Sequence, residues 1–543
     1  MFHPLWRQQA VHSVAEPFDL VVIGGGITGC GVLLDAAQRG LRTVLVERDD
    51  IASGTSSRSS KLIHGGLRYL KQMQLRITRL ACRERDRMLQ LSPHLVEPIR
   101  FLYPANRGDR TPGWQVDLGL WMYDHLTGRP ERHTQLSVSE IAELAPGLDT
   151  RSLDRALAYT DALADDARLT LAVAATAHAY GAEILTRCEV VEAERDLHGR
   201  VQAVLTHDVE SGANHRLETR GVVNATGVWT DQVRARLGLD GSHLRPSRGI
   251  HVILPPGHLP IRVAVTLPSP DDGRPVFMIP HREGILIGTT DHYHQSSLED
   301  PRPTSREVDY LLRAARAAFP STTIELEHVL GSFAGLRPIL DTYAQDPSEA
   351  SREEDIWEED GVLSVAGGKL TTWRSTAEEV VDAALKMLPE ERARTCAPCA
   401  TAGTPLAGVA PPDLAQRLVR ASGLEHEIAE GMARRLGSVA WQAVELARSA
   451  DELHPIRDDL DLAAAEVRAH LRWGAVLRLE DLLLRRVRIG MWRPSAIDEL
   501  LPGLEPLVRE ELGWDGPRWR GETEALHRAL EGWTLAGIRR AGE

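Results

Sequence analysis

The segment from Phe18 to Asp49 restricts the possible folds more than any other part of the chain. It reads FDLVVIGGGITGCGVLLDAAQRGLRTVLVERD, which joins an apolar run, a glycine cluster, an Ala- and Leu-rich stretch ending at Gly40 and a second apolar run. Continuous apolar strands are typical of a parallel sheet that is covered on both faces. We therefore predict a β-turn-α-β unit at the start of a Rossmann-like α/β domain.

The glycine cluster predicts a dinucleotide-binding site. Gly24, Gly26 and Gly29 have the GxGxxG spacing between the predicted strand and helix, and Glu47 ends the second strand. Glycines let the backbone approach a pyrophosphate, the helix N-terminus supplies N–H donors, and an acidic residue accepts from ribose hydroxyls. Because Glu47 would repel a 2′-phosphate, FAD or NAD is favoured over NADP.

Length and patterning predict three domains, since 543 residues exceed one ordinary core. Apolar segments within 182–209, 220–229 and 361–385 are predicted to return to the first sheet, so the nucleotide-binding domain is discontinuous. After Cys399, a Pro- and Gly-containing linker precedes a region with helical periodicity. The predicted division is a nucleotide-binding domain over 18–91, 152–244 and 331–395, an α+β substrate (cap) domain over 92–151 and 245–330, and an all-helical domain over 400–543.

Composition excludes several classes of protein. Hydrophobic residues make up 43% and charged residues 26%, as in a globular protein, and the net charge of −14 argues against a nucleic-acid partner. The sequence contains no uninterrupted apolar run of about 18 residues, so we predict no membrane-spanning helix. Five cysteines and no secretory signal pattern predict a reducing, cytoplasmic compartment. Cys396 and Cys399 form the single CxxC, which we interpret as part of a linker, and we predict no metal site.

Residues 51–66, IASGTSSRSSKLIHGG, follow the second predicted strand directly and are called the collar segment below. Their hydroxyls and paired glycines are expected where the chain passes close to a flat, polar group. Thr55-Ser56-Ser57 and the run from Ser59 to Tyr69 resemble the signature of FAD-dependent glycerol-3-phosphate dehydrogenases, of the amino-acid-oxidase-like flavoprotein class. The resemblance implies that this segment wraps the flavin of FAD and that Arg68 enters the substrate pocket.

The resemblance continues in order along the chain from Phe18 to about Arg493. Departures are few: Val228 stands where a proline is expected, and residues 1–17 match nothing in the family. The further matching motifs are Met122–Leu126, Asp165–Leu169, Asn224–Gly227, Gly249–His251, Gly288–Asp291, Gly335–Pro338, Gly367–Thr372 and Glu480–Leu483 with Arg485 and Arg486.

Oxidation of a secondary alcohol by a flavin needs a base for the hydroxyl proton and, for a phosphorylated substrate, cations for the dianion. His251 is the candidate base because imidazole titrates near neutral pH, although a buried structural histidine is the alternative. Arg68 and Arg337 offer planar donors for phosphate, with a surface salt bridge as the alternative for each.

Lys369 follows a glycine pair and would place an ammonium near the substrate or the reduced flavin. The alternative is a capping glycine pair with a solvated lysine. Tyr69 would donate a hydrogen bond to a substrate oxygen, or its ring would only pack against neighbouring side chains. We therefore predict His251, Arg337, Lys369 and Arg68 as catalytic residues and add Tyr69 to them as a substrate-binding residue.

The nucleotide pattern and the resemblance together imply a set of FAD-binding residues. Hydroxyls of the collar segment would meet pyrophosphate and ribityl oxygens, and its Lys61 and His64 would contact the flavin. The predicted set is Gly24, Gly26, Gly29, Glu47, Arg48, Thr55, Ser56, Ser59, Lys61, His64, Gly65, Val190, Ala225, Gly227, Gly368, Lys369, Leu370 and Thr371.

The resemblance implies oxidation of sn-glycerol 3-phosphate to dihydroxyacetone phosphate, with hydride transfer to flavin N5 and electrons passed to a membrane quinone. The alternatives are an oxidase that uses O₂, a flavin amine oxidase of the same fold class and a flavoprotein scaffold. The resemblance also implies a peripheral protein on the inner face of the cell membrane, with a homodimer as an option. Candidate membrane contacts, with docked ends of the chain as the alternative, are Phe2, Leu5, Trp6, Arg7, Arg485, Arg486, Arg488, Trp492 and Arg493.

Overall fold

A six-stranded sheet contains the predicted β-turn-α-β unit in the computed structural model, which describes residues 1–66, 74–126, 131–341 and 354–538. The strand order is β18-β19-β11-β1-β2-β7, and only β18 runs antiparallel to its neighbour. Because the strands come from widely separated segments, the predicted discontinuous Rossmann-like domain is confirmed. The strands are β1 Leu20–Ile23, β2 Thr43–Val46, β7 Glu183–Leu185, β11 Val222–Asn224, β18 Asp355–Glu359 and β19 Val362–Ala366.

Both faces of this sheet are covered, which explains its continuous apolar strands. Leu20 and Val22 of β1 pack in one core with three helices, whereas Val21 and Ile23 pack on the other face. That second face is covered by a three-stranded sheet and a short helix. The helices on the first face are α2 Ile27–Gln38, α7 Asp166–Ala179 and α10 Trp373–Leu385; the second face carries β8 Cys188–Arg195, β9 Val201–Asp208, β10 Asn214–Glu218 and α8 Thr230–Arg236.

The segment 182–209 returns to the parallel sheet only through β7. Its remaining part forms β8 and β9, which pair with β10 in the separate antiparallel sheet. The expectation that the whole segment returns to the first sheet was therefore wrong. Alternation of buried and exposed residues along β9 fits a sheet with one covered face, whereas β7 is short and almost fully buried.

A second, ten-stranded sheet lies beside the first. Its main path is β16-β12-β15-β14-β13-β4-β6-β3, with β17 paired to β12 and β5 paired to β6. The strands are β3 Leu62–Ile63, β4 Val96–Asn106, β5 Thr134–Gln135, β6 Leu153–Ala164, β12 Ser247–Leu254, β13 Ala264–Pro268, β14 Pro275–Pro280, β15 Ile285–Gly288, β16 His292–Tyr293 and β17 Gly331–Arg337. The helices of this part are α4 Leu75–Leu91, α5 Gly113–Leu126, α6 Val138–Leu144 and α9 Ser305–Ala318.

Strand pairing departs from the predicted domain boundaries at two places. The segments beginning at residues 152 and 331 were assigned to the nucleotide-binding domain, but β6 and β17 pair with strands of the larger sheet. Their main partners, β4 for β6 and β12 for β17, are more than 40 residues away in sequence, so local patterning carries no information about them. The three-domain division itself stays a prediction.

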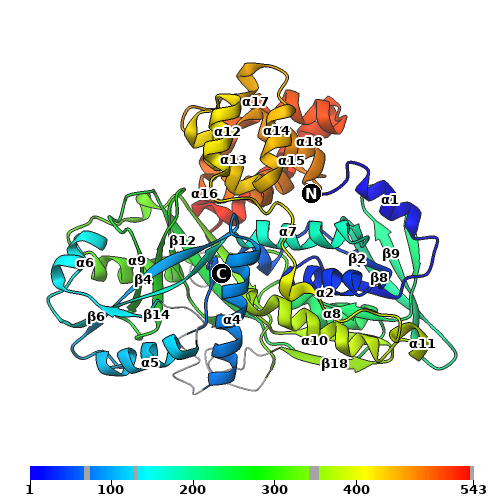
Figure 1. The fold of residues 1–543 in the computed structure, drawn as a ribbon, viewed down its shortest axis with the longest axis horizontal. Helices are drawn as coiled ribbons and strands as arrows, with labels where there is room; N and C mark the ends of the chain where they lie inside the picture. The colour runs from blue at the N-terminus through cyan, green and yellow to red at the C-terminus, as the bar shows by residue number, and fades with distance from the viewer. Residues whose placement is uncertain (67–73, 127–130, 342–353, 539–543) are drawn as a thin grey trace.

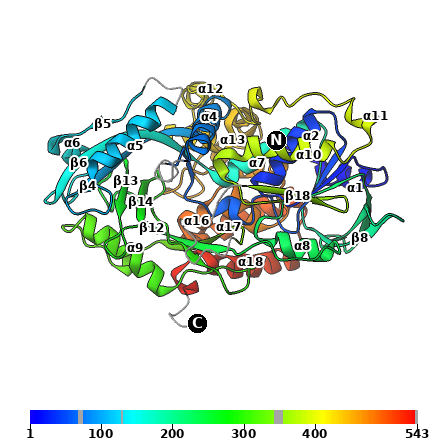
Figure 2. The same ribbon diagram turned by 90° about the horizontal axis from the view of Figure 1, so that it is seen from below.

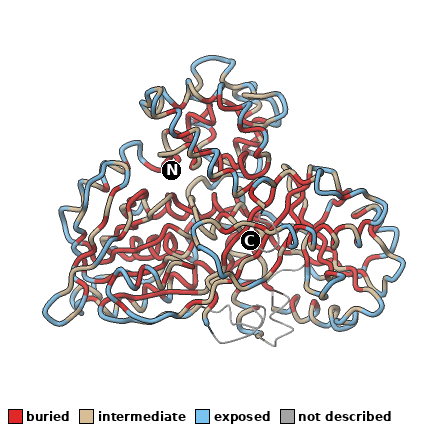
Figure 3. Tube along the Cα trace, turned by 180° about the vertical axis from the view of Figure 1, so that it is seen from behind, coloured by how far each residue is buried: buried red, intermediate tan, exposed pale blue. Residues whose placement is uncertain are grey.

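The C-terminal part is helical and lies above both sheets in Figure 1. Figure 2 shows the two sheets side by side, with β12 and α9 on one side and α2 and β18 on the other. Buried chain runs through the sheets and through the interior of the helical part, whereas exposed chain is concentrated at outer loops (Figure 3). The helices are α11 Glu390–Ala393, α12 Leu414–Ser422, α13 His426–Leu436, α14 Ala440–Glu445, α15 Ala464–Trp473, a π-helical segment Asp481–Arg486, α16 Ile489–Trp492, α17 Ile497–Leu512 and α18 Gly516–Leu530, while α1 Trp6–Ser13 lies near the N-terminus.

Most of the N-terminal membrane candidates are docked onto the protein. Phe2 and Trp6 are buried in the core under the first sheet, and the Arg7 guanidinium pairs with Asp208 at 2.6 Å. Among them only Leu5 is largely exposed, at 49%. Phe2, Trp6 and Arg7 therefore do not form a membrane contact, because their apolar area and charge are already satisfied within the chain.

Most of the C-terminal candidates are buried beneath the helical part. Arg485 and Arg486 both pair with the buried Asp50, which follows β2. Arg488 and Trp492 are buried as well, and Arg493 pairs with Asp459. A cation that leaves water needs a carboxylate partner, and these partners come from distant segments. No described helix is long and apolar enough to cross a bilayer.

Candidate active site

The turn between β1 and α2 has the geometry of a dinucleotide site. Gly24 has φ of +108°, and a Cβ atom on Gly29 would lie 2.0 Å from the Gly24 carbonyl oxygen. Only glycine fits at these two positions, because one needs a left-handed backbone and the other a close approach of helix and turn. The N-terminus of α2 opens at Gly26 and directs its backbone N–H groups toward the pocket described next.

Glu47 closes one end of the same site. Its Oε2 atom accepts from the Gly25 amide at 2.6 Å, and its Oε1 atom accepts from the Asp49 amide at 2.7 Å. Burial, with the nearby Asp49 carboxylate, raises the pKa of Glu47 to about 7 despite these hydrogen bonds. Hydroxyl donors of a ribose would stabilise the charged form of this carboxylate.

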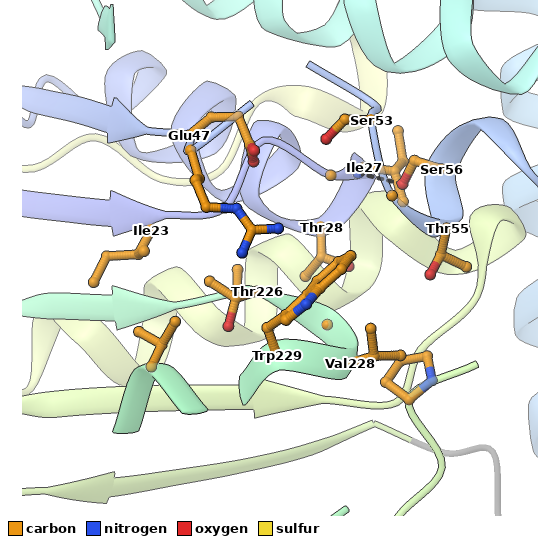
Figure 4. Close-up of a pocket in the computed structure, with 18 of the residues that line it drawn as sticks. Ile23, Ile27, Thr28, Glu47, Ser53, Thr55, Ser56, Thr226, Val228 and Trp229 are labelled. Atoms are coloured by element: carbon orange, nitrogen blue, oxygen red, sulfur yellow. Dashed lines mark hydrogen bonds between the residues drawn. The ribbon is translucent and has the colours of Figure 1, made fainter. Parts of the chain in front are cut away.

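An elongated pocket runs from Glu47 to the loop that follows β19. Figure 4 shows Glu47 and Ile23 at one end, Thr55 toward the other, and Trp229 between them. Thirteen residues of the predicted cofactor set line this one pocket, which supports their assignment as FAD contacts. They are Gly24, Gly26, Glu47, Arg48, Thr55, Ser56, Ser59, Val190, Ala225, Gly227, Gly368, Lys369 and Leu370.

The other predicted cofactor residues lie outside the pocket lining. Lys61 is buried and its ammonium binds the Asp166 carboxylate at 2.9 Å. The amide of His64 donates to the Thr371 hydroxyl, and the amide of Gly65 donates to the Tyr123 hydroxyl. These residues and Gly29 hold the backbone around the pocket, and direct contact with FAD stays a prediction for them. Arg68 and Tyr69 lie outside the described residues.

Several pocket residues were not named from the sequence. Ser53 and Gly54 come from the collar segment, and Pro338 follows β17. The indole of Trp229 donates to Glu299 at 3.0 Å, and Glu299 also pairs with Arg48, so the cap segment reaches the Glu47 end of the pocket. The contacts of Trp229 depend on a residue 70 positions away, which no local pattern reveals.

His251 lies on β12, buried beside the collar segment. Its Nε2 atom is 2.8 Å from the Ser60 hydroxyl, and its ring stacks on Phe333 at 4.9 Å between centroids. A side chain at Gly288, on the paired strand, would lie 2.2 Å from the imidazole, so glycine there makes room for the ring. Burial lowers the pKa of His251 well below its usual value, and the positive charges of Arg337 and Lys61 act in the same direction. The imidazole is therefore neutral near pH 7, as a proton acceptor must be.

Arg337 ends β17 close to His251. Its Nη1 atom donates to Asp291 at 3.0 Å, and its Nη2 atom donates to the Thr289 hydroxyl at 3.1 Å. The guanidinium lies over Gly249, where a Cβ atom would be 2.2 Å from Nη2. The motifs that contain residues 249–251, 288–291 and 335–338 thus meet, although more than 80 residues separate the first motif from the last.

Lys369 lines the pocket just after Gly367 and Gly368, which have φ of +80° and +79°. The same end of the pocket is lined by Ser59 and Pro338, the sequence neighbours of Ser60 and Arg337. Lys369 lines the pocket itself, whereas His251 and Arg337 lie outside its lining and adjoin it through Ser60 and Pro338. The catalytic roles of these three residues stay predictions.

A glycine-turn pocket of this length, with Glu47 at one end and a buried histidine and cations beside its lining, is typical of a dinucleotide-dependent oxidoreductase. The family model described as FAD dependent oxidoreductase matches residues 19–372, and the model for the C-terminal domain of alpha-glycerophosphate oxidase matches residues 399–518. An aerobic glycerol-3-phosphate dehydrogenase of Staphylococcus haemolyticus is 36% identical over 87% of this chain and 86% of its own length. One of Bacillus subtilis is 34% identical over 97% of this chain and 98% of its own length. The chain belongs to the aerobic glycerol-3-phosphate dehydrogenase family of FAD-dependent oxidoreductases.

Solved structures agree with this assignment. The glycerol-3-phosphate dehydrogenase of Bacillus halodurans, complexed with FAD, superposes with a TM-score of 0.80 at 29% identity and covers 98% of both chains. The L-alpha-glycerophosphate oxidase of Mycoplasma pneumoniae, with FAD bound, has a TM-score of 0.54 at 21% identity over 67% of this chain and 94% of its own, which shows the shared fold alone. FAD is the cofactor, and the glycine turn, Glu47 and the elongated pocket fit it.

Proposed function

We propose that this chain oxidises sn-glycerol 3-phosphate to dihydroxyacetone phosphate. FAD supplies the acceptor for the hydride, at N5 of its isoalloxazine ring. The neutral imidazole of His251 takes the proton of the substrate hydroxyl, while Arg337, together with Arg68, binds the phosphate dianion. Lys369 places a positive charge where the reduced cofactor becomes anionic. The observation that carries the proposal is the proximity of His251 and Arg337 to each other, beside the collar segment that lines the dinucleotide pocket.

The purified yellow holoenzyme is expected to lose its flavin absorbance anaerobically when glycerol 3-phosphate is added. Glycine and sarcosine should leave the spectrum unchanged, because an amine oxidase would instead need a carboxylate-binding site. Bleaching by an amine but not by glycerol 3-phosphate would contradict the proposal, and bleaching by none of the three would favour a scaffold. Reoxidation of the bleached protein by a ubiquinone analogue, compared with air, identifies the electron acceptor, for which we propose a membrane quinone.

A surface on α5 suits contact with the membrane that carries such a quinone. Trp114, Leu118 and Trp121 recur at helical spacing on one face of α5 and are 55%, 49% and 53% exposed. The neighbouring helix α4 exposes Leu75 at its start and then a basic stripe. In Figure 1 α5 lies on the side opposite the helical part, and α4 runs from that side toward the middle of the molecule. The residues of this α5 surface are Trp114, Leu118 and Trp121 with Leu75, Arg76, Arg79 and Arg83 of α4.

An anionic bilayer is the occupant that this surface fits, because Trp and Leu enter the interface and the arginines meet lipid phosphates. We propose that the protein is peripheral on the inner face of the cell membrane and docks through the α5 surface. The α5 surface replaces the membrane-contact candidates at the two ends of the chain, most of which are buried.

Changing Trp114, Leu118 and Trp121 together to serine is expected to lower binding to phosphatidylglycerol vesicles by at least about tenfold, since three apolar side chains lose their burial in lipid. Co-sedimentation measures the bound fraction, and FAD content should not change. The matched control is the triple change of Val191, Leu197 and Val209 to serine, which removes apolar residues at least as exposed from β8 and from the turns that flank β9. Equal loss of binding in both triple variants would contradict docking through α5.

A further inference from the structure

The base His251 has one hydrogen-bond partner among the described residues, and that partner belongs to the collar segment. The Ser60 hydroxyl is 2.8 Å from Nε2, whereas Nδ1 has no partner. The charged groups that face the ring, Arg337 of β17 and Lys61 of the collar segment, are not bonded to it. The orientation of the imidazole therefore depends on where Ser60 is held.

Asp166, fully buried at the start of α7, fixes the residues on both sides of Ser60. Its Oδ2 atom accepts from the Ser59 amide at 3.1 Å and from the Ser59 hydroxyl at 2.7 Å. Its Oδ1 atom accepts from the Lys61 ammonium at 2.9 Å. Lys61 has φ of +59°, a left-handed conformation that a non-glycine residue adopts only when its surroundings hold it.

The helical part completes this arrangement with a buried cation. Arg488, which precedes α16, is 0% exposed, and its Nη1 atom lies 3.1 Å from Oδ1 of Asp166. Its Nη2 atom donates to the Ser57 carbonyl at 3.2 Å, and the Lys61 ammonium donates to the same carbonyl at 3.3 Å. Arg488 thus links the Ser57 carbonyl, which precedes Ser60, to the Asp166 carboxylate. The same carboxylate binds the residues on both sides of Ser60.

A second contact from the helical part reaches the opposite side of the base. His251 and Ile253 share one face of β12, and Ile253 packs there in a core formed largely by the helical part. The Trp533 ring of that part packs at a tilt against Phe333 with centroids 5.1 Å apart, and Phe333 stacks on His251. The imidazole is therefore held between a hydrogen bond with the collar segment and an aromatic stack, and the helical part supports both.

We propose that Ser60 is a positioning residue for the base His251, and that the helical part sets its place through Arg488 and Asp166. Nε2–H of the neutral imidazole donates to the hydroxyl of Ser60, which fixes the ring and leaves the lone pair of Nδ1 to take the substrate proton. The proposal rests on the proposed function, since it assumes that His251 is the base.

Changing Ser60 to alanine is expected to lower the limiting rate of anaerobic flavin reduction by glycerol 3-phosphate about tenfold, the effect of losing one neutral hydrogen bond. The half-saturating substrate concentration should change less than twofold. Because the Ser60 hydroxyl accepts from Nε2–H, a hydrogen bond that strengthens when the ring is charged, its loss should move the acid limb of the kcat/KM profile to lower pH. The His251 ring signals in ¹⁵N-histidine NMR spectra, assigned through their loss in His251→Asn, should titrate at a correspondingly lower pH without substrate.

Arg488→Lys tests the contribution of the helical part. The lysine keeps the positive charge but is shorter and lacks the guanidinium, so it reaches Ser57 and Asp166 less well. We expect flavin reduction three- to tenfold slower than in the wild type and a pH shift in the same direction as in Ser60→Ala. Arg187→Lys is the matched control, because Arg187 is a cation at the same interface that binds Glu480 and Asp481 without touching Ser57 or Asp166. It should leave the rate and the pH profile of the holoenzyme unchanged, even where its melting temperature falls.

The proposal would be overturned by a Ser60→Ala enzyme that reduces flavin within twofold of the wild-type rate with an unmoved His251 titration. It would also be overturned by an Arg187→Lys enzyme whose rate and pH profile match those of Arg488→Lys. Failure of the proposed function can be distinguished from failure of this positioning proposal, because the wild-type enzyme itself would then not be bleached by glycerol 3-phosphate.

Discussion

Replacing His251 with asparagine is expected to slow anaerobic flavin reduction by glycerol 3-phosphate by at least about 10²-fold, the usual contribution of a general base. Asparagine keeps a polar side chain in the space beside Gly288 but cannot accept the proton. FAD content should stay at the wild-type level, because His251 does not line the pocket of the glycine turn. Stopped-flow absorbance at saturating substrate measures the effect.

The control for this variant is His281→Asn. His281 follows β14 in the same sheet and packs against Trp492 with ring centroids 4.7 Å apart, and it forms no hydrogen bond with the described residues of the collar segment. Its variant should reduce flavin at nearly the wild-type rate.

The lowered pKa of His251 also predicts that kcat/KM is retained well below pH 6.5 before the imidazole takes a proton. A His251→Asn enzyme within threefold of the wild-type rate would remove His251 from the role of base.

Replacing Arg337 with glutamine should raise the half-saturating concentration of glycerol 3-phosphate about 10²-fold, as expected from the loss of charge-assisted hydrogen bonds worth about 3 kcal/mol. The same change leaves Asp291 without its 3.0 Å ion pair, which adds a repulsive charge near the phosphate. The concentration dependence of flavin reduction separates this loss of affinity from a change in the limiting rate.

Two comparisons make the Arg337 test specific for phosphate. Slow reduction by glycerol, which has no phosphate, should be nearly the same in the variant and the wild type. Arg248→Gln, a change on β12 at a residue that pairs with Glu307, should leave the half-saturating concentration unchanged. If Arg337→Gln weakened glycerol and glycerol 3-phosphate equally, or weakened neither, Arg337 would not be a phosphate ligand.

The β-turn-α-β unit could be predicted because all of its information is local. The apolar runs of β1 and β2, the glycine spacing and Glu47 lie within 30 residues of one another, and hydrogen bonds from Gly25 and Asp49 to Glu47 close the site. The later motifs could be recognised as a set by resemblance, and the structure brings three of them together around His251 and Arg337.

Domain membership and burial could not be predicted in the same way. β6 and β17 look like strands of the first sheet, yet their partners place them in the second. The arginines near residue 488 resemble a membrane-facing basic cluster, but Asp50 and Asp166 neutralise them in the protein interior. A cationic side chain has the same sequence signature in both settings, and only its partners distinguish them.

The sequence by itself determined the nucleotide turn, the α/β class and the family, since these follow from short-range spacing of glycines, apolar runs and motifs. Only the tertiary structure decided which histidine contact matters, because Ser60 and His251 are 191 residues apart and meet through the pairing of β12 with β17 and the packing of the collar segment. Long-range contacts of this kind depend on how buried surfaces and charges are satisfied by the whole fold.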